Sequence, residues 1–265
     1  MIDYSTPGPL TELRPDQLHL TERLPADPLG ICKAVQSLII QPYDATAAGI
    51  PEERLLERNL RPAAALVDAL VALDPNSLDH PRTPEHRVVG SCRHFATLAT
   101  ALLRLRGIPA RARCGFGTYF IPGKNVDHWI VEYRLAESDR WVRVDVEHLD
   151  RDWPATLDDL QPGEFLTGGE AWQWYRTGAV AGDLFGVAGV DYAWGAGEIR
   201  ANAIRDLAAL NKLELLPWDE WSRMEESFED KTGPEFDTLI DEIAATDDPE
   251  ALYPKADLAA PETMR

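Results

Sequence analysis

The chain has 265 residues, of which 45% are hydrophobic and 27% charged, a composition typical of a globular protein large enough to bury a core. The formal net charge of −19 would repel phosphate backbones, so no nucleic acid partner is expected. No apolar run approaches the roughly 20 residues that span a bilayer, and the first residues do not form a secretory signal, so we expect a cytoplasmic protein without membrane contact.

The first 87 residues read as a helical N-terminal part. Residues 1–30 contain five prolines and predict an irregular lead-in. The apolar segment 31–40 predicts a helix. A second helix is predicted over 61–73, because Leu66, Leu70 and Leu73 recur at spacings of four and three.

Residues 88–150 predict the core. Apolar residues from Phe95 to Leu105 form one stripe of a helix that begins near Ser91, and Gly107 followed by Pro109 ends it. Alternating patterns then predict three strands, at 110–116, 128–135 and 141–147. One helix followed by an antiparallel sheet is an α+β arrangement.

Residues 151–265 predict a mostly helical C-terminal extension, with helices at 198–211 and 237–245 and a loose acidic tail at 246–265. We therefore expect a single domain over 1–265, in which the core at 88–150 carries both extensions.

A candidate nucleophile lies at the start of the predicted core helix. Cys92 would occupy the first turn, where a helix N-terminus and a neighbouring imidazolium can lower a thiol pKa and where free backbone N–H groups can bind an oxyanion. Gly90 would let the backbone turn tightly and would leave room for a substrate carbonyl. The alternative interpretation is that Cys92, like Cys32 and Cys114, is a small buried hydrophobic residue.

A base and an orienting acid follow on the predicted strands. His128 lies on the second strand and Asp145 on the third, which completes the residue types of a thiol nucleophile with its base and acid. If His128 lies opposite Glu147, Asp145 is its diagonal neighbour and within side-chain reach. Since the sequence does not give the register, Glu147 remains the rival for the acidic role.

Other histidines offer a metal site as an alternative. Cys92, His94, His128 and His148 are ligand types, but Cys-x-His at a helix start points its two side chains in different directions. We therefore expect no metal and no other cofactor, and we expect His94 on the helix surface or behind the nucleophile. The aromatic residues at 172–175 are interpreted as ordinary packing, with a cleft wall as the alternative.

These motifs together resemble the bacterial transglutaminase-like superfamily. The resemblance covers residues 88–147, about a quarter of the chain, and the matching motifs are GSC at 90–92 with FA at 95–96, LLR at 102–104, GIPAR at 107–111, DHW at 127–129 with E at 132, and WVRVD at 141–145. It implies a papain-like fold in its transglutaminase arrangement, with Cys92 as nucleophile, His128 as base and Asp145 as orienting acid. The sequence departs from the family pattern at three places. The family often has an acidic residue where this chain has His94. It more commonly has His-Ala-Trp where this chain has His-Trp, and Pro-Thr where Val-Glu follows Asp145.

The predicted function is acyl transfer through a thioester on Cys92, with hydrolysis of a peptide, protein or small-molecule acyl substrate slightly favoured. An acyltransferase that forms an amide bond is the first alternative. A non-catalytic peptide-binding module and a metal-dependent hydrolase are the others. We expect substrate choice to depend on the extensions, which match no known motif.

Overall fold

The computed structural model describes residues 2–135, 137–221, 223–228, 233–254 and 258–264. The α-helices are α1 Pro28–Gln36, α2 Pro42–Ala47, α3 Ala63–Leu73, α4 Cys92–Leu105, α5 Gly168–Arg176, α6 Ala196–Leu210, α7 Arg223–Phe228, α8 Pro234–Ala245 and α9 Pro249–Leu252. The strands are β1 Ile39–Ile40, β2 Val88–Val89, β3 Ala110–Gly117, β4 Asn125–Leu135, β5 Arg140–Val144, β6 Phe165–Thr167 and β7 Phe185–Gly186. Short 3₁₀ helices cover Pro15–Thr21, Glu52–Asn59, Pro84–His86, Gly182–Leu184 and Glu262–Met264.

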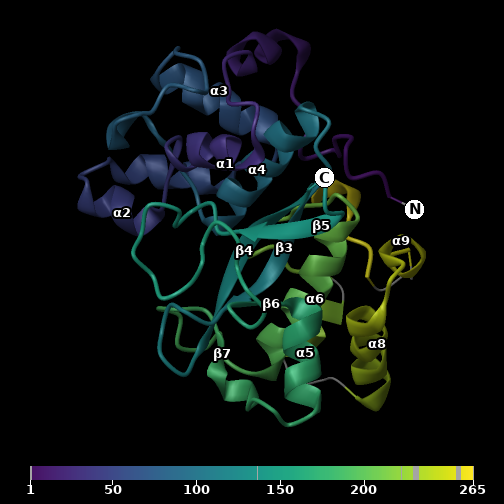
Figure 1. The fold of residues 1–265 in the computed structure, drawn as a ribbon. Coiled ribbons are helices and arrows are strands. Elements are labelled where there is room, and N and C mark those ends of the chain that lie inside the picture. Colours follow the sequence, from purple (N-terminus) through teal and green to yellow (C-terminus); the bar gives the residue numbers. More distant parts are fainter. Residues whose placement is uncertain (1, 136, 222, 229–232, 255–257, 265) are drawn as a thin grey trace.

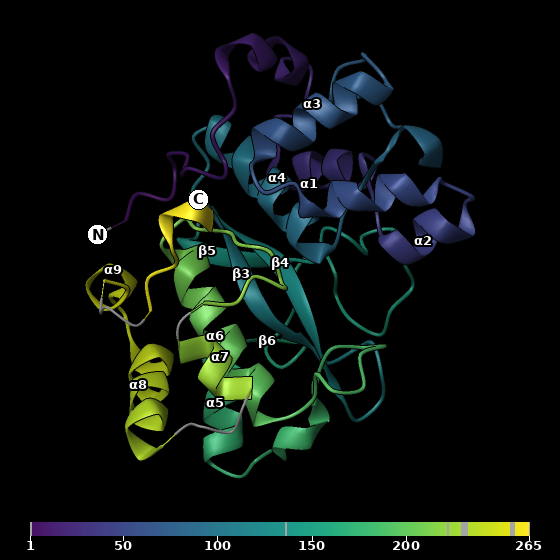
Figure 2. The same cartoon turned by 180° about the vertical axis from the view of Figure 1, so that it is seen from behind.

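The predicted α+β arrangement is confirmed. The main sheet has the order β5-β4-β3-β6 with antiparallel neighbours, and β7 pairs in parallel with the start of β4. Helices α1 to α4 gather at one end of this sheet, and α5, α6 and α8 gather at the other (Figure 1). The view from behind shows α6 and α7 on the same side as α5 (Figure 2).

Helix α4 packs the N-terminal part onto the sheet. Its residues Leu98 and Leu102 are fully buried with Leu66 of α3 and Val131 of β4 in one hydrophobic cluster. The helix ends as the sequence predicts, because Gly107 adopts a φ of 70°, a left-handed conformation that favours glycine. The same alternation that predicted β3 and β4 pairs Ala110 through Gly117 with Tyr133 through Val126.

A buried charge cluster ties β3, β4 and β5 together. Glu132 of β4 accepts hydrogen bonds from Arg111 at 2.6 Å, Arg113 at 2.9 Å and Arg143 at 2.9 Å. Although burial opposes ionisation, these three guanidinium groups lower the pKa of Glu132. Because a charge buried without partners is costly, this cluster favours one register of the three strands.

Three predicted elements differ from the structure. The third strand was expected at 141–147 but its pairing with β4 ends at Val144. Asp145 donates its backbone N–H to the carbonyl of Leu157, on the edge of β5 where the carbonyl of Arg143 accepts from Leu160. The segment 31–40 is divided between the end of α1 and strand β1. The lead-in contains a 3₁₀ helix, Pro15–Thr21.

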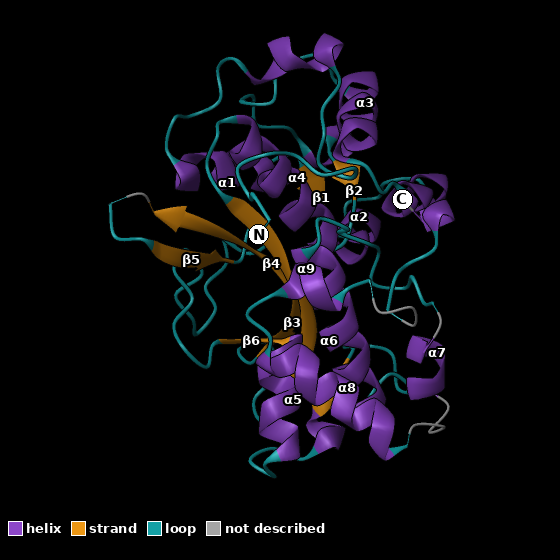
Figure 3. Cartoon of the chain, turned by 90° about the vertical axis from the view of Figure 1, so that its right-hand side faces the viewer, coloured by secondary structure: helices purple, strands orange, loops and turns teal. Residues whose placement is uncertain are grey.

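The expected loose tail is also wrong for its described residues. Leu252, Tyr253 and Leu258 are buried with Trp221 in the hydrophobic cluster of the C-terminal part. The sequence signal was weak here because these apolar residues are separated by polar and proline residues and have no helical period. Helix α9 follows α8 along the chain and lies above it in the side view (Figure 3). In the described part of the chain, no helix combines the length and the apolar character needed to cross a membrane.

Candidate active site

Cys92 is the first residue of α4, and a capping box holds the start of that helix. Ser91 is the N-cap, and its backbone N–H donates to His94 Nδ1 at 3.0 Å. The other ring nitrogen, His94 Nε2, lies 3.1 Å from the carbonyl oxygen of Leu60. His94 is fully buried, so the expectation of a helix-surface position is wrong. It takes the place of the Glu or Gln of an ordinary capping box and positions the residue before Cys92.

Gly90 is required for packing. A Cβ at this position would lie 2.8 Å from both Cβ and Cγ of His94. Its backbone does not adopt a left-handed conformation, so the tight turn expected from the sequence is not the reason for glycine here. Gly90 therefore allows the His94 ring to approach the backbone and cap the helix.

His128 lies where the edge of β4 is open. β4 pairs with β5 through residues 131–135 and with β7 through Asn125 and Val126, on the edge away from β3. Within the described residues, no strand pairs with 127–130 on that edge. β5 has turned away at Asp145, so this opening faces the turn that carries Asp145 and Glu147.

Asp145 is fully buried and has three side-chain neighbours. Its Oδ2 accepts a hydrogen bond from the Tyr119 hydroxyl at 2.6 Å. His148 Nδ1 lies 3.0 Å from the same oxygen, and His128 Nε2 lies 3.1 Å from Oδ1. The His128 contact has the distance of an ion pair but not the angle of a hydrogen bond. Although burial opposes ionisation, His128 and His148 lower the pKa of Asp145, which keeps it a carboxylate at neutral pH.

The structure brings the predicted residues together. Cys92 Sγ, a ring nitrogen of His128 and a carboxylate oxygen of Glu147 lie within 4.8 Å of one another. Because Nε2 of His128 faces Asp145, Nδ1 is the nitrogen available to the thiol. Cys92 is half-buried and His128 is buried, so the group lies at the edge of the core.

Comparison with known proteins places this constellation in a family. The sequence model of the transglutaminase-like superfamily matches residues 66–146, which contain the nucleophile helix and all three strands of the predicted core. Residues 66–146 are a transglutaminase-like domain. The match begins in α3, so it includes part of the segment assigned to the N-terminal extension.

One solved structure is also similar to the chain. It is the crystal structure of a putative cysteine protease from Cytophaga hutchinsonii, with 16% sequence identity and a TM-score of 0.32. The similarity covers 63% of the present chain and 51% of the other, so the chain spans about half the length of that protein. A search of curated proteins gives no match.

The two carboxylates that the sequence offered have different positions in the transglutaminase-like domain. Val131 of β4 pairs with Val144 of β5. If β5 continued in this register, Glu147 would lie opposite His128. Since the strand ends first, Asp145 reaches Nε2 of His128 from the turn, and Glu147 lies beside the thiol. This geometry favours Asp145 for the acidic role.

The pKa of the Cys92 thiol is higher than the sequence predicts. Burial raises the pKa of Cys92 well above its ordinary value, and the carboxylates of Glu147 and Asp127 raise it further. A hydrogen bond from the Trp129 backbone opposes this increase. The direction is opposite to the lowered pKa expected from the helix start and the imidazole, because burial and the carboxylates of Glu147, Asp127 and Asp145 favour the neutral thiol.

Sequence reasoning missed two groups around Asp145. Tyr119 lies in the loop between β3 and β4, and His148 was considered only as a metal ligand. Phe120 packs against both imidazoles, with ring centroids 4.9 Å from His128 and 5.1 Å from His148. The spacing of three residues from Asp145 to His148 is the signal that could have found the second histidine, since side chains that far apart meet in a turn.

The remaining candidates lie outside this group. Cys32 and Cys114 are buried in the core, as expected. His94 is oriented toward Leu60, so the metal set that combined it with Cys92, His128 and His148 is not supported. Trp172 is fully buried, in agreement with the packing interpretation, whereas Trp174 is exposed and lines a hollow of about 590 Å³ that none of the three triad candidates lines.

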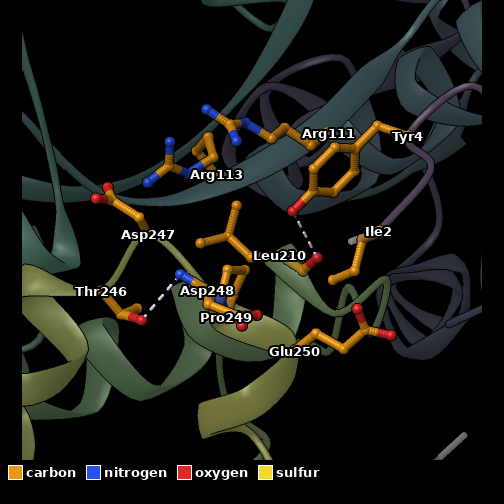
Figure 4. A pocket seen from close by; sticks show the side chains of 10 residues that line it. All are labelled: Ile2, Tyr4, Arg111, Arg113, Leu210, Thr246, Asp247, Asp248, Pro249 and Glu250. Carbon is orange, nitrogen blue, oxygen red and sulfur yellow. Dashed lines mark hydrogen bonds between the residues drawn. The ribbon is translucent and has the colours of Figure 1, made fainter.

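A cavity of about 470 Å³ lies away from the candidate active site. Figure 4 shows Tyr4, Arg111 and Arg113 on one side of it and the turn around Asp247 on the other. None of the three triad candidates lines it. A hollow of about 50 Å³ lies next to the site. Phe95, Glu147 and His148 line one side of it. Residues of the N-terminal part line the other side, and these are Gln36, Ile39, Ile40, Gln41 and Asp44.

The buried histidine cap gives the transglutaminase-like domain a pH-dependent stability. Burial, aided by the Arg93 charge, lowers the pKa of His94 to about 3, whereas an unfolded histidine titrates near 6.5. Because the unfolded chain binds this proton more readily, the free energy of unfolding should fall below about pH 6.5 by up to about 1.4 kcal/mol per pH unit until about pH 3. His94→Gln, which keeps a capping-box side chain, should remove this part of the slope in urea unfolding. Identical slopes for the two proteins would contradict the assignment.

The negative charge of Glu147 should be measurable at the thiol. Glu147→Gln removes that charge, so the pKa of Cys92 should fall and iodoacetamide should alkylate Cys92 faster at pH 8 than in the wild type. Peptide mapping separates Cys92 from the two buried cysteines. The matched control is Glu53→Gln, an exposed site that should leave the rate unchanged. An unchanged or slower rate in Glu147→Gln would show that its carboxylate does not act on the thiol.

Proposed function

We propose that the protein is a cysteine-nucleophile acyl-transfer enzyme in which Cys92 attacks, His128 transfers protons and Asp145 orients the imidazole. The single observation that carries this proposal is the approach of Cys92 Sγ, the His128 ring and the Asp145 carboxylate from three separate elements. The match of residues 66–146 to the transglutaminase-like superfamily supports it.

The raised pKa of Cys92 defines the first step. The resting thiol is neutral, so His128 must accept its proton as sulfur attacks the acyl carbon. The imidazolium that forms is stabilised by the buried Asp145 carboxylate, which does not itself take the proton. The negative oxygen of the tetrahedral intermediate would lie at the N-terminus of α4, where the Cys92 N–H can donate to it.

The next steps return the proton and release the product. His128 protonates the leaving amine, the bond from acyl carbon to nitrogen breaks, and a thioester on Cys92 remains. Water then attacks the thioester, His128 accepts the proton of that water, and the acid product leaves as sulfur regains its proton. We favour hydrolysis, as in a peptidase or amidase, because water reaches a half-buried thiol without a second binding site. An amine in place of water would give amide formation.

The substrate class that we propose is a peptide, protein or small-molecule acyl compound. The hollow beside Glu147 and His148 is closed on its other side by residues of α1, β1 and α2. Because these residues belong to the N-terminal part and lie next to Glu147, we propose that this part contributes to substrate choice. No cofactor is required by the proposed steps.

The test uses p-nitrophenyl acetate as an acyl donor with the full chain. The wild type should release p-nitrophenol and carry one acetyl group on Cys92, seen by mass spectrometry after acid quenching. Cys92→Ala and His128→Ala should abolish turnover, and Asp145→Ala should reduce it by about 10³–10⁴-fold, as in comparable triads. His19→Ala, at an exposed histidine, is the control that should behave as the wild type.

Three results would change the proposal. Normal turnover in Cys92→Ala would contradict it, provided that circular dichroism shows native folding in each variant. Full activity in Asp145→Ala with loss in Glu147→Ala would assign the acidic role to Glu147. Added glycine methyl ester that captures most of the acetyl group as an amide would favour acyltransfer over hydrolysis.

A further inference from the structure

Glu147 needs an explanation beyond the proposed reaction. Its side chain is only 9% exposed and lies within 4.8 Å of both the Cys92 sulfur and a His128 nitrogen. A carboxylate at this position opposes formation of the thiolate, which an acyl-transfer enzyme needs during attack. Thiolate sulfur, imidazole nitrogen and carboxylate oxygen are together the ligand types that bind Zn²⁺.

The surroundings already provide the support that a metal-bound histidine requires. Histidine ligands almost always donate their second ring N–H to a carboxylate, which fixes the ring and raises its basicity. Nε2 of His128 is buried without a hydrogen-bond partner and lies 3.1 Å from the Asp145 carboxylate. A small rotation of the ring would form that bond and direct Nδ1 toward Cys92 and Glu147.

The local charge also favours a cation. The buried Asp145 carboxylate lies 3.1 Å from His128 Nε2 and adds negative charge beside the three ligand atoms. A divalent cation between the three ligand atoms would offset this repulsion. A hollow of about 50 Å³ adjoins Glu147 and His148, although neither Cys92 nor His128 lines it.

We propose that Cys92, His128 and Glu147 form a binding site for one thiophilic divalent cation, Zn²⁺, which occupies the thiol and blocks its attack. Binding converts the Cys92 thiol to a zinc-bound thiolate and releases one proton to solvent, with no change in oxidation state. Zinc bonds are about 2.0–2.3 Å long, so the three ligand atoms would move closer together on binding, and water would complete a tetrahedron. The ligand set stands on the geometry of the three side chains, whereas the blocking role rests on the proposed function.

The experiment measures the metal site in the full chain. After treatment with chelator and buffer exchange, the protein is titrated with ZnCl₂ by calorimetry and with CoCl₂ by absorption spectroscopy. One ion should bind per chain, Co²⁺ should give a thiolate charge-transfer band, and Zn²⁺ should protect Cys92 from iodoacetamide. Glu147→Gln should weaken Zn²⁺ binding by at least about tenfold, as even supporting residues do at such sites.

Matched variants separate this site from other metal binding. Glu53→Gln, at an exposed position, should bind Zn²⁺ as the wild type does. Cys92→Ser should lose the Co²⁺ band. A band that persists in Cys92→Ser, or a Glu147→Gln affinity equal to that of the wild type, would overturn the proposal.

The two proposals fail in different ways. A metal-free protein that forms the acetyl thioester but does not bind Zn²⁺ would refute the metal site and leave the proposed function standing. A protein that binds Zn²⁺ at Cys92 and loses its hydrolytic activity when chelated would refute zinc as a blocking ion and the thiol mechanism with it.

Discussion

The buried carboxylate of Asp145 is the interaction on which the candidate site depends. An ionised group without solvent is costly unless partners surround it, and here the partners are Tyr119, His128 and His148. Tyr119 comes from the loop after β3, His128 from β4 and His148 from the turn after β5. Three segments that are separate in sequence therefore meet at the Asp145 carboxylate. The contact of Asp145 with Nε2 orients the His128 imidazole and leaves Nδ1 available to the thiol. The turn that buries Asp145 also opens the edge of β4 at His128, which links the position of the acid to that of the base.

The electrostatics of the thiol follow from the same turn. Because β5 ends at Val144, the chain that carries Asp145 inward also places Glu147 beside Cys92. The result is a nucleophile with a raised pKa, which differs from a preformed thiolate–imidazolium pair. Such a thiol reacts only when a base takes its proton, and it is a good ligand for a cation that replaces that proton. The same negative charges around Cys92 therefore underlie both the proposed proton transfer to His128 and the proposed metal binding.

The sequence predicted the parts of the fold that depend on local pattern and spacing. Helix α4 and strands β3 and β4 have strong periods and clear end signals, so their existence and order could be read directly, and motif order was sufficient to predict the family. The position of Asp145 relative to Glu147 could not be read, because it depends on where β5 stops pairing with β4, and the alternating pattern of residues 141–147 continues past that point. The capping role of His94 was missed because histidine stands where a capping box ordinarily has Glu or Gln. The second histidine on Asp145 is a local contact whose spacing was overlooked, whereas the packing of the C-terminal tail is a tertiary contact that no local pattern predicts.

Cross-linking of the intact protein tests the central claim most directly. 1,3-Dibromoacetone alkylates a thiol first and then bridges it to a second nucleophile within a few ångströms. Peptide mapping after reaction should find a single bridge from the sulfur of Cys92 to the ring of His128, formed at a rate that depends on native folding. Alkylation of Cys92 with no bridge to His128, or with a bridge only to His148, would show that the thiol and the proposed base do not meet.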